Sequence, residues 1–583
     1  MKKLIYILLL AVSFTSCNFL DTTIYNNPEG DQVIDDENGC MAGLTGIYDI
    51  LGNSALYGQN LWADLDAGTD IMYYNRDYGK DYLYVCMYNY NNTEERLNET
   101  WKALYTGIDR ANDFLAQLAN LTDSQCGGAA KKTMYEAEAR ALRALLYMNL
   151  VAYWGEVPLR TTPTKDLTTQ LLKKSPQADI YAQIFEDLQY GAGIVDENGK
   201  VIEEGHCLPA NELNAPGRIS RTTAQGLLAR AYLWYSGYPV EGNTWKEARG
   251  YAKAVMNSGL HDLNRTSSDS KYANGYPGLF IKMCSNQYDL TARESMFEVE
   301  FYGNGLDASN EAGKVGLYNG VTQSATYDPD VPFAYGWYNA THILLRLYDK
   351  KYGVVSKKDK ETGDQRKWWN LADFTWKKDE ANKKVYKEML TEAQMNTDNR
   401  KACPGKWRAE YDPIRPWARN NSSINFPILR YSDILLMFAE ADNEINGPTP
   451  DAIAAINEVR TRAGASAIAS GEVPPKNSEE TVDINTPEGM RQFIFEERTR
   501  ELCFETPRHM ELRRMGKDFF YNRIKLLVST DVYANGDKHI IGYPLDDVAS
   551  VPARNIDTSK HIYLPIPQCE LNTNTICGQN EGW

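Results

Sequence analysis

Hydrophobic residues recur every three to four positions in two long stretches of the chain, and this spacing predicts amphipathic helices. Residues 99–121 are the clearest case in the first stretch, and one face of that segment is formed by Trp101, Leu104, Ile108, Ala111 and Leu115. Residues 133–159 continue the same period until Gly155 and Pro158 end it. The pattern therefore predicts two adjacent helices.

Small residues mark the places where further helices of the first stretch approach one another. Ala224 and Ala231 stand at close-packing positions of one helical segment. The next segment begins with Thr244 and Glu247, which have the spacing of a capping box, and it ends at Gly259. Helix pairs of this kind build tetratricopeptide-like arrays, so the sequence predicts a mainly α-helical repeat scaffold.

The second stretch repeats this arrangement near residue 440. Residues 431–464 predict a hairpin of two helices, the first of which ends at Asn446-Gly447-Pro448. Thr449 is expected to cap the second helix, with Pro450 in its first turn. A further helix is predicted to start in the same way, with Thr486 followed by a proline.

The residues between the two helical stretches, 261–425, are rich in Gly, Asn, Asp, Tyr and Trp and show no sustained period. This composition predicts loops and short strands, which are the regions where binding residues commonly lie. We therefore expect one composite domain over residues 36–583. Its parts would be helical repeats at about 36–260 and 426–516, the loop-rich insertion at about 261–425, and a C-terminal segment at 517–583.

The N-terminus has the pattern of an export signal followed by a lipid attachment site. Two lysines precede an apolar run that is too short to span a bilayer, so residues 1–16 are expected to be a signal peptide. The residues before Cys17 resemble a bacterial lipobox, with Phe14 in place of the usual leucine. Acyl chains on Cys17 would tether residues 17–35 to a membrane, at about 0.8 kcal/mol for each buried methylene. An ordinary signal followed by an incidental cysteine is the alternative.

Charge and cysteine spacing argue against several function classes. A net charge of −16, with no basic run of five residues, argues against nucleic-acid binding. Beyond Cys17, nine scattered cysteines form no C-x-x-C pair, which excludes zinc ribbons and thioredoxin chemistry. We expect most of them to be buried free thiols.

The histidines are spread singly along the chain, so neither a metal site nor a cofactor is predicted. Asp328 and Asp330 could supply calcium ligands, but such a pair is usually only a turn.

Two groups of carboxylates could be mistaken for catalytic pairs. Glu496, Glu497 and Glu501 alternate with arginines at helical spacing, as in Glu496 with Arg500, which predicts a structural ion-pair network in residues 496–514 instead of a separated acid and base. Glu298 and Glu300 stand two positions apart on a predicted strand, which we expect to be an edge strand facing solvent. No catalytic residue is predicted.

Two aromatic clusters contain the candidate binding residues. The first, residues 72–92, holds seven tyrosines; the alternating ones at its end are expected in a packed strand or loop, whereas Tyr73, Tyr74 and Arg76 are expected to be more exposed. The second cluster lies in residues 326–339. Sugar rings stack their C–H faces on aromatic rings, while polar side chains at the edge bind hydroxyls. The candidate glycan-binding residues are Asp70, Tyr73, Tyr74, Asn75, Arg76, Tyr327, Tyr335, Trp337 and Tyr338.

Six motifs resemble, in order, those of the SusD/RagB family of Bacteroidota surface lipoproteins. They are EARALRALLYMNLVAYWGEVPL, ISRTTAQGLLARAYLW, FPILRYSDILLMFAEADNEI, AIAAINEVRTRAG, IFEERTRELCFETPRHMELRRMGK and YLPIPQCELNTN. The segment CNFLDTTIYNNP, at the expected mature N-terminus, resembles the opening of the family as well. Cys503 and His509 depart from the pattern, because apolar residues are commoner at their positions.

The resemblance implies a SusD-like α/α superhelix with four tetratricopeptide-like units and a ligand-binding face of loops and short strands. It implies a lipoprotein on the outer face of the outer membrane, without catalytic activity or a cofactor. Such a protein captures a glycan and acts as the lid of a TonB-dependent SusC-like transporter. A peptide-capturing lid of the RagB kind is the alternative. An anchored glycoside hydrolase is a third hypothesis, which lacks a recognisable acid and base in the sequence.

Overall fold

A computed structural model of the chain describes residues 34–76, 84–164, 169–272, 274–306, 312–348, 363–395, 401–471, 482–505, 507–528 and 542–583. Cys17 and the tyrosines Tyr78 and Tyr82 lie outside these residues. Helices dominate the described chain and the strands are short, which confirms the predicted mainly α fold.

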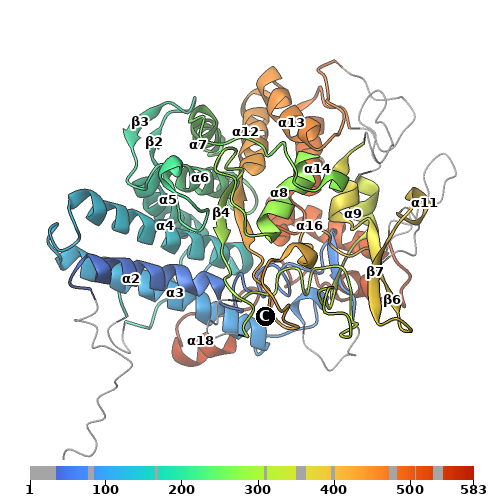
Figure 1. Cartoon of the computed structure of the whole chain (residues 1–583). Coiled ribbons are helices and arrows are strands. Elements are labelled where there is room, and N and C mark those ends of the chain that lie inside the picture. The colour runs from blue at the N-terminus through green and yellow to red at the C-terminus, as the bar shows by residue number, and fades with distance from the viewer. Residues whose placement is uncertain are drawn as a thin grey trace, which may run out of the picture.

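The first helical stretch forms one side of the molecule (Figure 1). Its helices pack in series, because α3 contacts α4, α4 contacts α5, α5 contacts α6 and α6 contacts α7. Their bounds are Glu37–Asp49 (α2), Glu95–Asn120 (α3), Ala129–Trp154 (α4), Gln177–Ala192 (α5), Arg221–Ser236 (α6) and Trp245–Asn257 (α7). Ala224 and Ala231 are fully buried in α6, as their close-packing positions predict.

The second stretch continues this array through a contact between α7 and α12. Its helices are α12 (Tyr431–Asn446), α13 (Pro450–Arg462), α14 (Pro487–Leu502), α15 (Arg508–Arg514) and α16 (Lys517–Lys525). The other α-helices of the described residues are α8 (Gly275–Cys284), α9 (His342–Leu347), α10 (Gln365–Asn370), α11 (Glu392–Met395), α17 (Val551–Asn555) and α18 (Gln568–Thr573).

Most of the predicted helix boundaries are confirmed by their backbone contacts. The hydroxyls of Thr449 and Thr486 each accept a hydrogen bond from a first-turn amide at 3.1 Å. Gly447 ends α12 with a positive φ of 74°. The capping box predicted at Thr244 is wrong: its hydroxyl donates to the Tyr232 carbonyl at 2.9 Å, because the end of α6 lies closer than its own helix.

In the part of the chain that the structure describes, the strands form four antiparallel pairs. The insertion pairs with strands outside it: β1 (Met72–Tyr74) pairs with β5 (Tyr338–Ala340), and β4 (Ser295–Val299) pairs with β8 (Phe426–Arg430). Hairpin β6–β7 (Phe374–Asp379 and Lys384–Met389) projects on the side opposite α2 to α7 (Figure 1). The last pair, β2–β3 (Gly193–Val195 and Val201–Glu204), extends the helical side.

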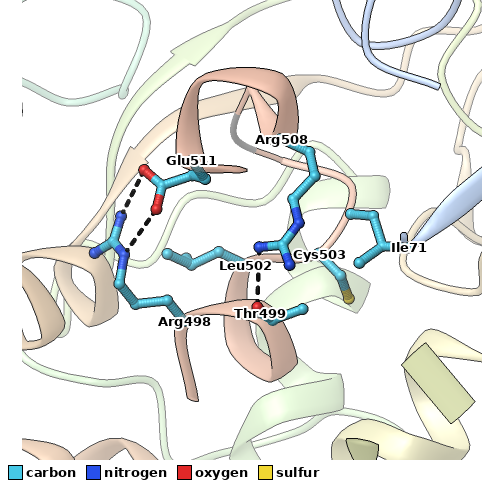
Figure 2. Close-up of a pocket in the computed structure, with 7 residues that line it drawn as sticks. All are labelled: Ile71, Arg498, Thr499, Leu502, Cys503, Arg508 and Glu511. Atoms are coloured by element: carbon cyan, nitrogen blue, oxygen red, sulfur yellow. Dashed lines mark hydrogen bonds and ion pairs between the residues drawn. The ribbon is translucent and has the colours of Figure 1, made fainter. Parts of the chain in front are cut away.

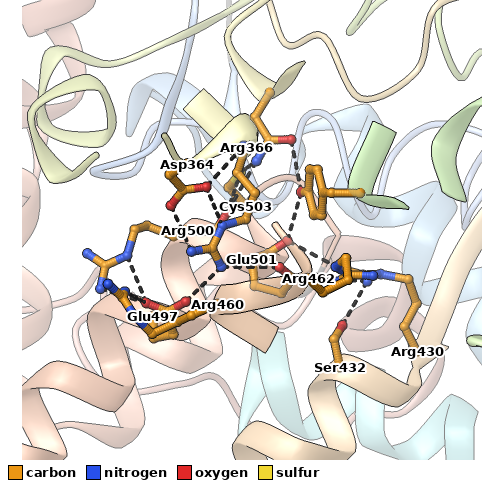
Figure 3. Close-up of polar contacts among 12 residues, drawn as sticks. Asp364, Arg366, Arg430, Ser432, Arg460, Arg462, Glu497, Arg500, Glu501 and Cys503 are labelled. Carbon is orange, nitrogen blue, oxygen red and sulfur yellow. Dashed lines mark hydrogen bonds and ion pairs between the residues drawn. The ribbon is translucent and has the colours of Figure 1, made fainter. Parts of the chain in front are cut away.

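Carboxylates of residues 496–514 form buried ion pairs, as predicted, and Figure 3 shows those around Glu497 and Glu501. Glu497 binds Arg366 at 2.7 Å and Arg460 at 2.8 Å, while Glu501 binds Arg430 at 3.0 Å and Arg462 at 2.6 Å. Burial opposes ionisation, but these guanidiniums outweigh it and lower the pKa of Glu501 to about 2. A carboxylate held ionised between arginines has a structural role and is unsuited to general acid catalysis.

Candidate functional site

The β1–β5 pair places the candidate aromatic residues beside one another. Asn75 follows β1 and donates its backbone N–H to the carbonyl of Trp337 at 2.8 Å. Trp337 in turn donates its backbone N–H to the carbonyl of Tyr318 at 2.7 Å. The preceding Gly336 has a φ of +54°, and a Cβ there would lie 2.1 Å from the Thr322 hydroxyl oxygen. Glycine is favoured at this turn, because its positive φ and the close approach of Thr322 both disfavour a side chain, and the turn precedes the tryptophan.

Tyr318, Phe333, Tyr335 and Trp337 form a half-buried aromatic cluster. The ring of Trp337 stacks on that of Tyr318, with centroids 4.1 Å apart, and Tyr335 lies 5.0 Å from Trp337. Phe333 meets Tyr335 edge-on at 4.7 Å. The rings therefore support one another while part of each remains accessible, as a stacking surface requires.

Polar and cationic groups border the aromatic cluster. The Tyr335 hydroxyl donates to Asn420 Oδ1 at 2.8 Å, and Lys314 Nζ donates to the Asn420 carbonyl at 2.9 Å. The Lys314 ammonium lies 5.6 Å from the Tyr318 ring, and the Arg419 guanidinium lies 4.9 Å from the Phe333 ring. Burial lowers the pKa of Lys314. This border can donate hydrogen bonds to the hydroxyls or anionic groups of a ligand.

The expected exposure of Tyr73 and Tyr74 is wrong. Tyr73 is 1% exposed and Tyr74 is 4% exposed, because β1 is covered on both faces. Tyr73 packs against Tyr543, and Tyr74 packs against the rings of Trp337 and Tyr338. Tyr338 is buried as well, and its hydroxyl donates to Asp64 at 3.0 Å. Tyr74 thus supports the cluster through Trp337, and none of these three buried rings offers a surface to a ligand in this structure.

The prediction that Asp70 hydrogen-bonds the hydroxyls of a ligand is also wrong. Its carboxylate is fully buried and accepts hydrogen bonds from Arg508 at 2.9 Å and Arg523 at 2.6 Å. Burial raises its pKa, but the two guanidiniums prevail and lower it below its usual range. Figure 2 shows Arg508 also reaching Thr499, to which it donates at 2.9 Å, beside a small cavity. Asp70 thus joins β1 to the C-terminal helices.

The remaining candidates fall into three groups. Arg76 is exposed, as expected. Asn75 is half-buried and donates its side-chain amide to the Gly336 carbonyl at 2.7 Å and to Asn339 at 2.6 Å, so it holds the turn. Tyr327 is half-buried, and the Lys383 ammonium lies 5.2 Å from its ring. Tyr335 and Trp337 are the candidates that the structure brings together in an accessible cluster.

Two of the carboxylate predictions have different outcomes. Asp328 accepts the backbone N–H of Asp330 at 3.2 Å and pairs with Lys384, which fits a turn. Glu298 is only 5% exposed, so the expected solvent-facing position is wrong; Glu300 is exposed. Burial raises the pKa of Glu298 to about 7, even though Asn425 donates to it at 2.9 Å. In the described part of the chain, no cluster of three possible metal ligands occurs.

Two family models together match most of the chain. The model described as "Starch-binding associating with outer membrane" matches residues 18–233, and the model described as "SusD family" matches residues 300–583. The chain belongs to the SusD family. The second match contains the whole aromatic cluster, whereas β1, which supports that cluster, lies in the first.

Known relatives resemble this chain at low sequence identity. "SusD-like protein P25" of Formosa agariphila is 23% identical over 98% of this chain and 97% of its own length. A crystal structure of a SusD homolog from Bacteroides thetaiotaomicron superposes with a TM-score of 0.76 at 24% identity, covering 95% of this chain and 98% of the homolog. A laminarin-binding SusD-like protein has a TM-score of 0.61 at 20% identity, covering 94% and 100%. Similarity at this level establishes the fold.

A pocket of about 330 Å³ lies beside the aromatic cluster of this SusD-family protein. Its lining comes from segments around Thr322, Trp376 and Cys403. Thr322 lines the pocket and also lies against Gly336, the residue before Trp337. The pocket and the aromatic cluster are therefore neighbours. The volume is in the range that small ligands occupy, and Trp376 and Phe374 give the pocket aromatic walls.

The sequence gives no signal for several residues at the site. Tyr318, Lys314, Arg419 and Asn420 were not among the candidates, because they lie outside both aromatic clusters of the sequence. They reach the site through the hydrogen bond between Trp337 and Tyr318 and the contacts of Asn420. Only the folded chain brings these segments together.

Proposed function

We propose that this SusD-family protein binds a glycan at the aromatic cluster and the adjoining pocket. The observation that carries the proposal is the half-buried cluster around Trp337, bordered by Asn420, Lys314 and Arg419. Aromatic faces with hydrogen-bonding edges match the alternation of C–H and hydroxyl groups on sugars. The laminarin-binding SusD-like protein with the same fold supports this ligand class.

The wider proposal is a nutrient-uptake lipoprotein on the outer surface of the outer membrane. Cys17 would carry the lipid anchor, and the protein would act as the lid of a TonB-dependent SusC-like transporter for import. The name of the matching family model, which refers to association with the outer membrane, supports this location. No helix in the described segments is long and apolar enough to cross a membrane. We propose a binding protein without catalytic activity.

Cys17→Ala tests the anchor. Loss of labelling at the cell surface, together with release from the membrane fraction, is the expected result. Unchanged membrane association would contradict lipidation. Purification of the unaltered protein from outer membranes tests its role as a transporter lid. A SusC-like transporter should copurify with it, and its absence from the purified material would contradict that role.

Calorimetric titration against a panel of glycans and oligopeptides tests the ligand class. A lid must release its ligand, so we expect glycan dissociation constants from micromolar to millimolar, roughly −4 to −8 kcal/mol. Tight binding of peptides with no response to any glycan would favour the RagB-like alternative. The glycans recovered after incubation should carry no new reducing ends, because their appearance would indicate a hydrolase. The specificities of hydrolases encoded beside the gene would identify the glycan.

A further inference from the structure

Two buried cysteine thiols are in contact at the start of α2, outside the residues of the proposed glycan site. The sulfur atoms of Cys40 and Cys126 lie 3.8 Å apart, and both residues are 0% exposed. Cys40 is in the first turn of α2, and Cys126 is in the turn between α3 and α4. Both are free thiols in this structure. A disulfide has a sulfur–sulfur distance of about 2.05 Å, so the sulfurs need to approach by less than about 2 Å.

Neighbouring contacts hold the two backbones together at this point. Gln125 Nε2 donates to the carbonyl of Asp35 at 3.1 Å, and Lys131 forms an ion pair with Glu37. A Cβ on Gly127 would lie 2.1 Å from a carboxylate oxygen of Glu37, so the turn already touches the start of α2. The α3–α4 turn and the start of α2 are thus in contact before any disulfide forms. Rotation of the two cysteine side chains has only to bring the sulfur atoms closer.

We propose that Cys40 and Cys126 form a disulfide in the exported protein. The oxidant is a disulfide of another molecule, either an oxidoreductase or a small thiol in its oxidised form. One cysteine thiolate attacks that disulfide and releases one oxidant thiol; the second cysteine attacks the mixed disulfide and releases the other. Two electrons pass to the oxidant sulfurs, which take up the two protons that the cysteines lose.

The burial of the thiols determines when this bond forms. Burial and the hydrogen bond with Cys126 raise the pKa of Cys40 to about 12, so the reactive thiolate is scarce at neutral pH in the folded chain. Neither sulfur is accessible to an oxidant in the folded chain. The exchange therefore takes place while α2 is still undocked, after export into an oxidising compartment. Protein folded under reducing conditions keeps both thiols.

Peptide mapping of the full chain, exported by its host and unfolded under non-reducing conditions with an alkylating reagent, tests the pairing. Trypsin should yield the peptide of residues 111–131 joined to the peptide that ends at Arg76, two hydrogens lighter than their sum. Reduction should separate them. Recovery of alkylated Cys40 and Cys126 from the exported protein would overturn the proposal, as would pairing of either residue with another cysteine.

Thermal melts with and without reductant measure the effect of the bond. The closed loop is long, so reduction should lower the melting temperature of the exported protein by about 3 °C or more. Cys126→Ala should abolish that difference. Cys284→Ala, which also removes a buried sulfur, should retain it. A reductant effect that persists in Cys126→Ala would contradict the assignment.

Discussion

Trp337 is the residue on which the proposed glycan site most depends. Its ring stacks on Tyr318, contacts Tyr335 and rests on the buried Tyr74, so three rings fix its orientation. A fixed ring loses little conformational entropy when a sugar stacks on it, which favours binding by a shallow surface. Asp70, in contrast, acts on this surface only through the strand that it anchors.

Trp337→Ala should weaken glycan binding by about tenfold or more, because one stacked ring contributes on the order of 1 to 3 kcal/mol. The ring is half-buried, so the free energy of unfolding should fall by less than the roughly 3 to 5 kcal/mol expected for a buried tryptophan. Calorimetric titration beside a thermal melt separates the two effects. Tyr386→Ala, an exposed tyrosine on β7, is the control and should bind normally. Retained affinity in a destabilised Trp337 variant would remove this residue from the site.

At the scale of secondary-structure elements, the turn before β5 positions the aromatic cluster. Gly336 has a positive φ and lies against Thr322, while Asn75 donates its side-chain amide to the Gly336 carbonyl. The stacking surface and the adjoining pocket share this turn. A change in its backbone should therefore alter ligand binding without changing any group that contacts the ligand.

Gly336→Ala should destabilise the fold by about 1 to 3 kcal/mol, since it adds backbone strain and a clash with Thr322. It should also weaken glycan binding, because Trp337 shifts with the turn. Gly259→Ala is a matched control: its φ is +63°, but no atom lies within 4 Å of the added Cβ. That control should show strain alone and bind glycan normally. Equal binding by both variants would show that the turn does not position the site.

Buried carboxylates give the whole protein two opposed responses to pH. Glu501, like Glu497, has a lowered pKa in the arginine network, so its stabilisation is present above the unfolded pKa of about 4.3 and is lost on acidification. Glu298 has a pKa raised to about 7 by burial. The stability that protonated Glu298 contributes is fully present below the pKa of this residue in the unfolded chain, and it is lost as the pH rises through 7.

Glu298→Gln isolates the second response. Between pH 4.5 and pH 8, the free energy of unfolding of the variant should rise by about 3 kcal/mol relative to the unaltered protein, because glutamine cannot ionise. The Asn425 amide can still donate to the glutamine oxygen. Urea unfolding at several pH values measures the difference, with exposed Glu203→Gln as a control. A difference that does not change with pH would show that Glu298 titrates normally.

The sequence by itself determined the helical array and the positions at which several helices begin and end. Threonine caps, a proline in the first turn and a glycine at the helix end act within a few residues, so they can be read locally. The arginine and carboxylate pattern of α14 likewise predicted ion pairs. The capping box predicted at Thr244 shows the limit of local interpretation, since the Thr244 hydroxyl donates to a carbonyl of the neighbouring helix α6 instead.

Only the tertiary structure decided which aromatic residues face outward. Tyr73 and Trp337 lie in similar tyrosine-rich sequences, yet the first is buried within the β1–β5 pair and the second, next to β5, is half-buried. Asp70 has the chemistry of a sugar-binding residue, but Arg508 and Arg523, distant in sequence, neutralise it. Exposure and ion pairing depend on contacts between segments hundreds of residues apart, and no local pattern of side chains encodes them.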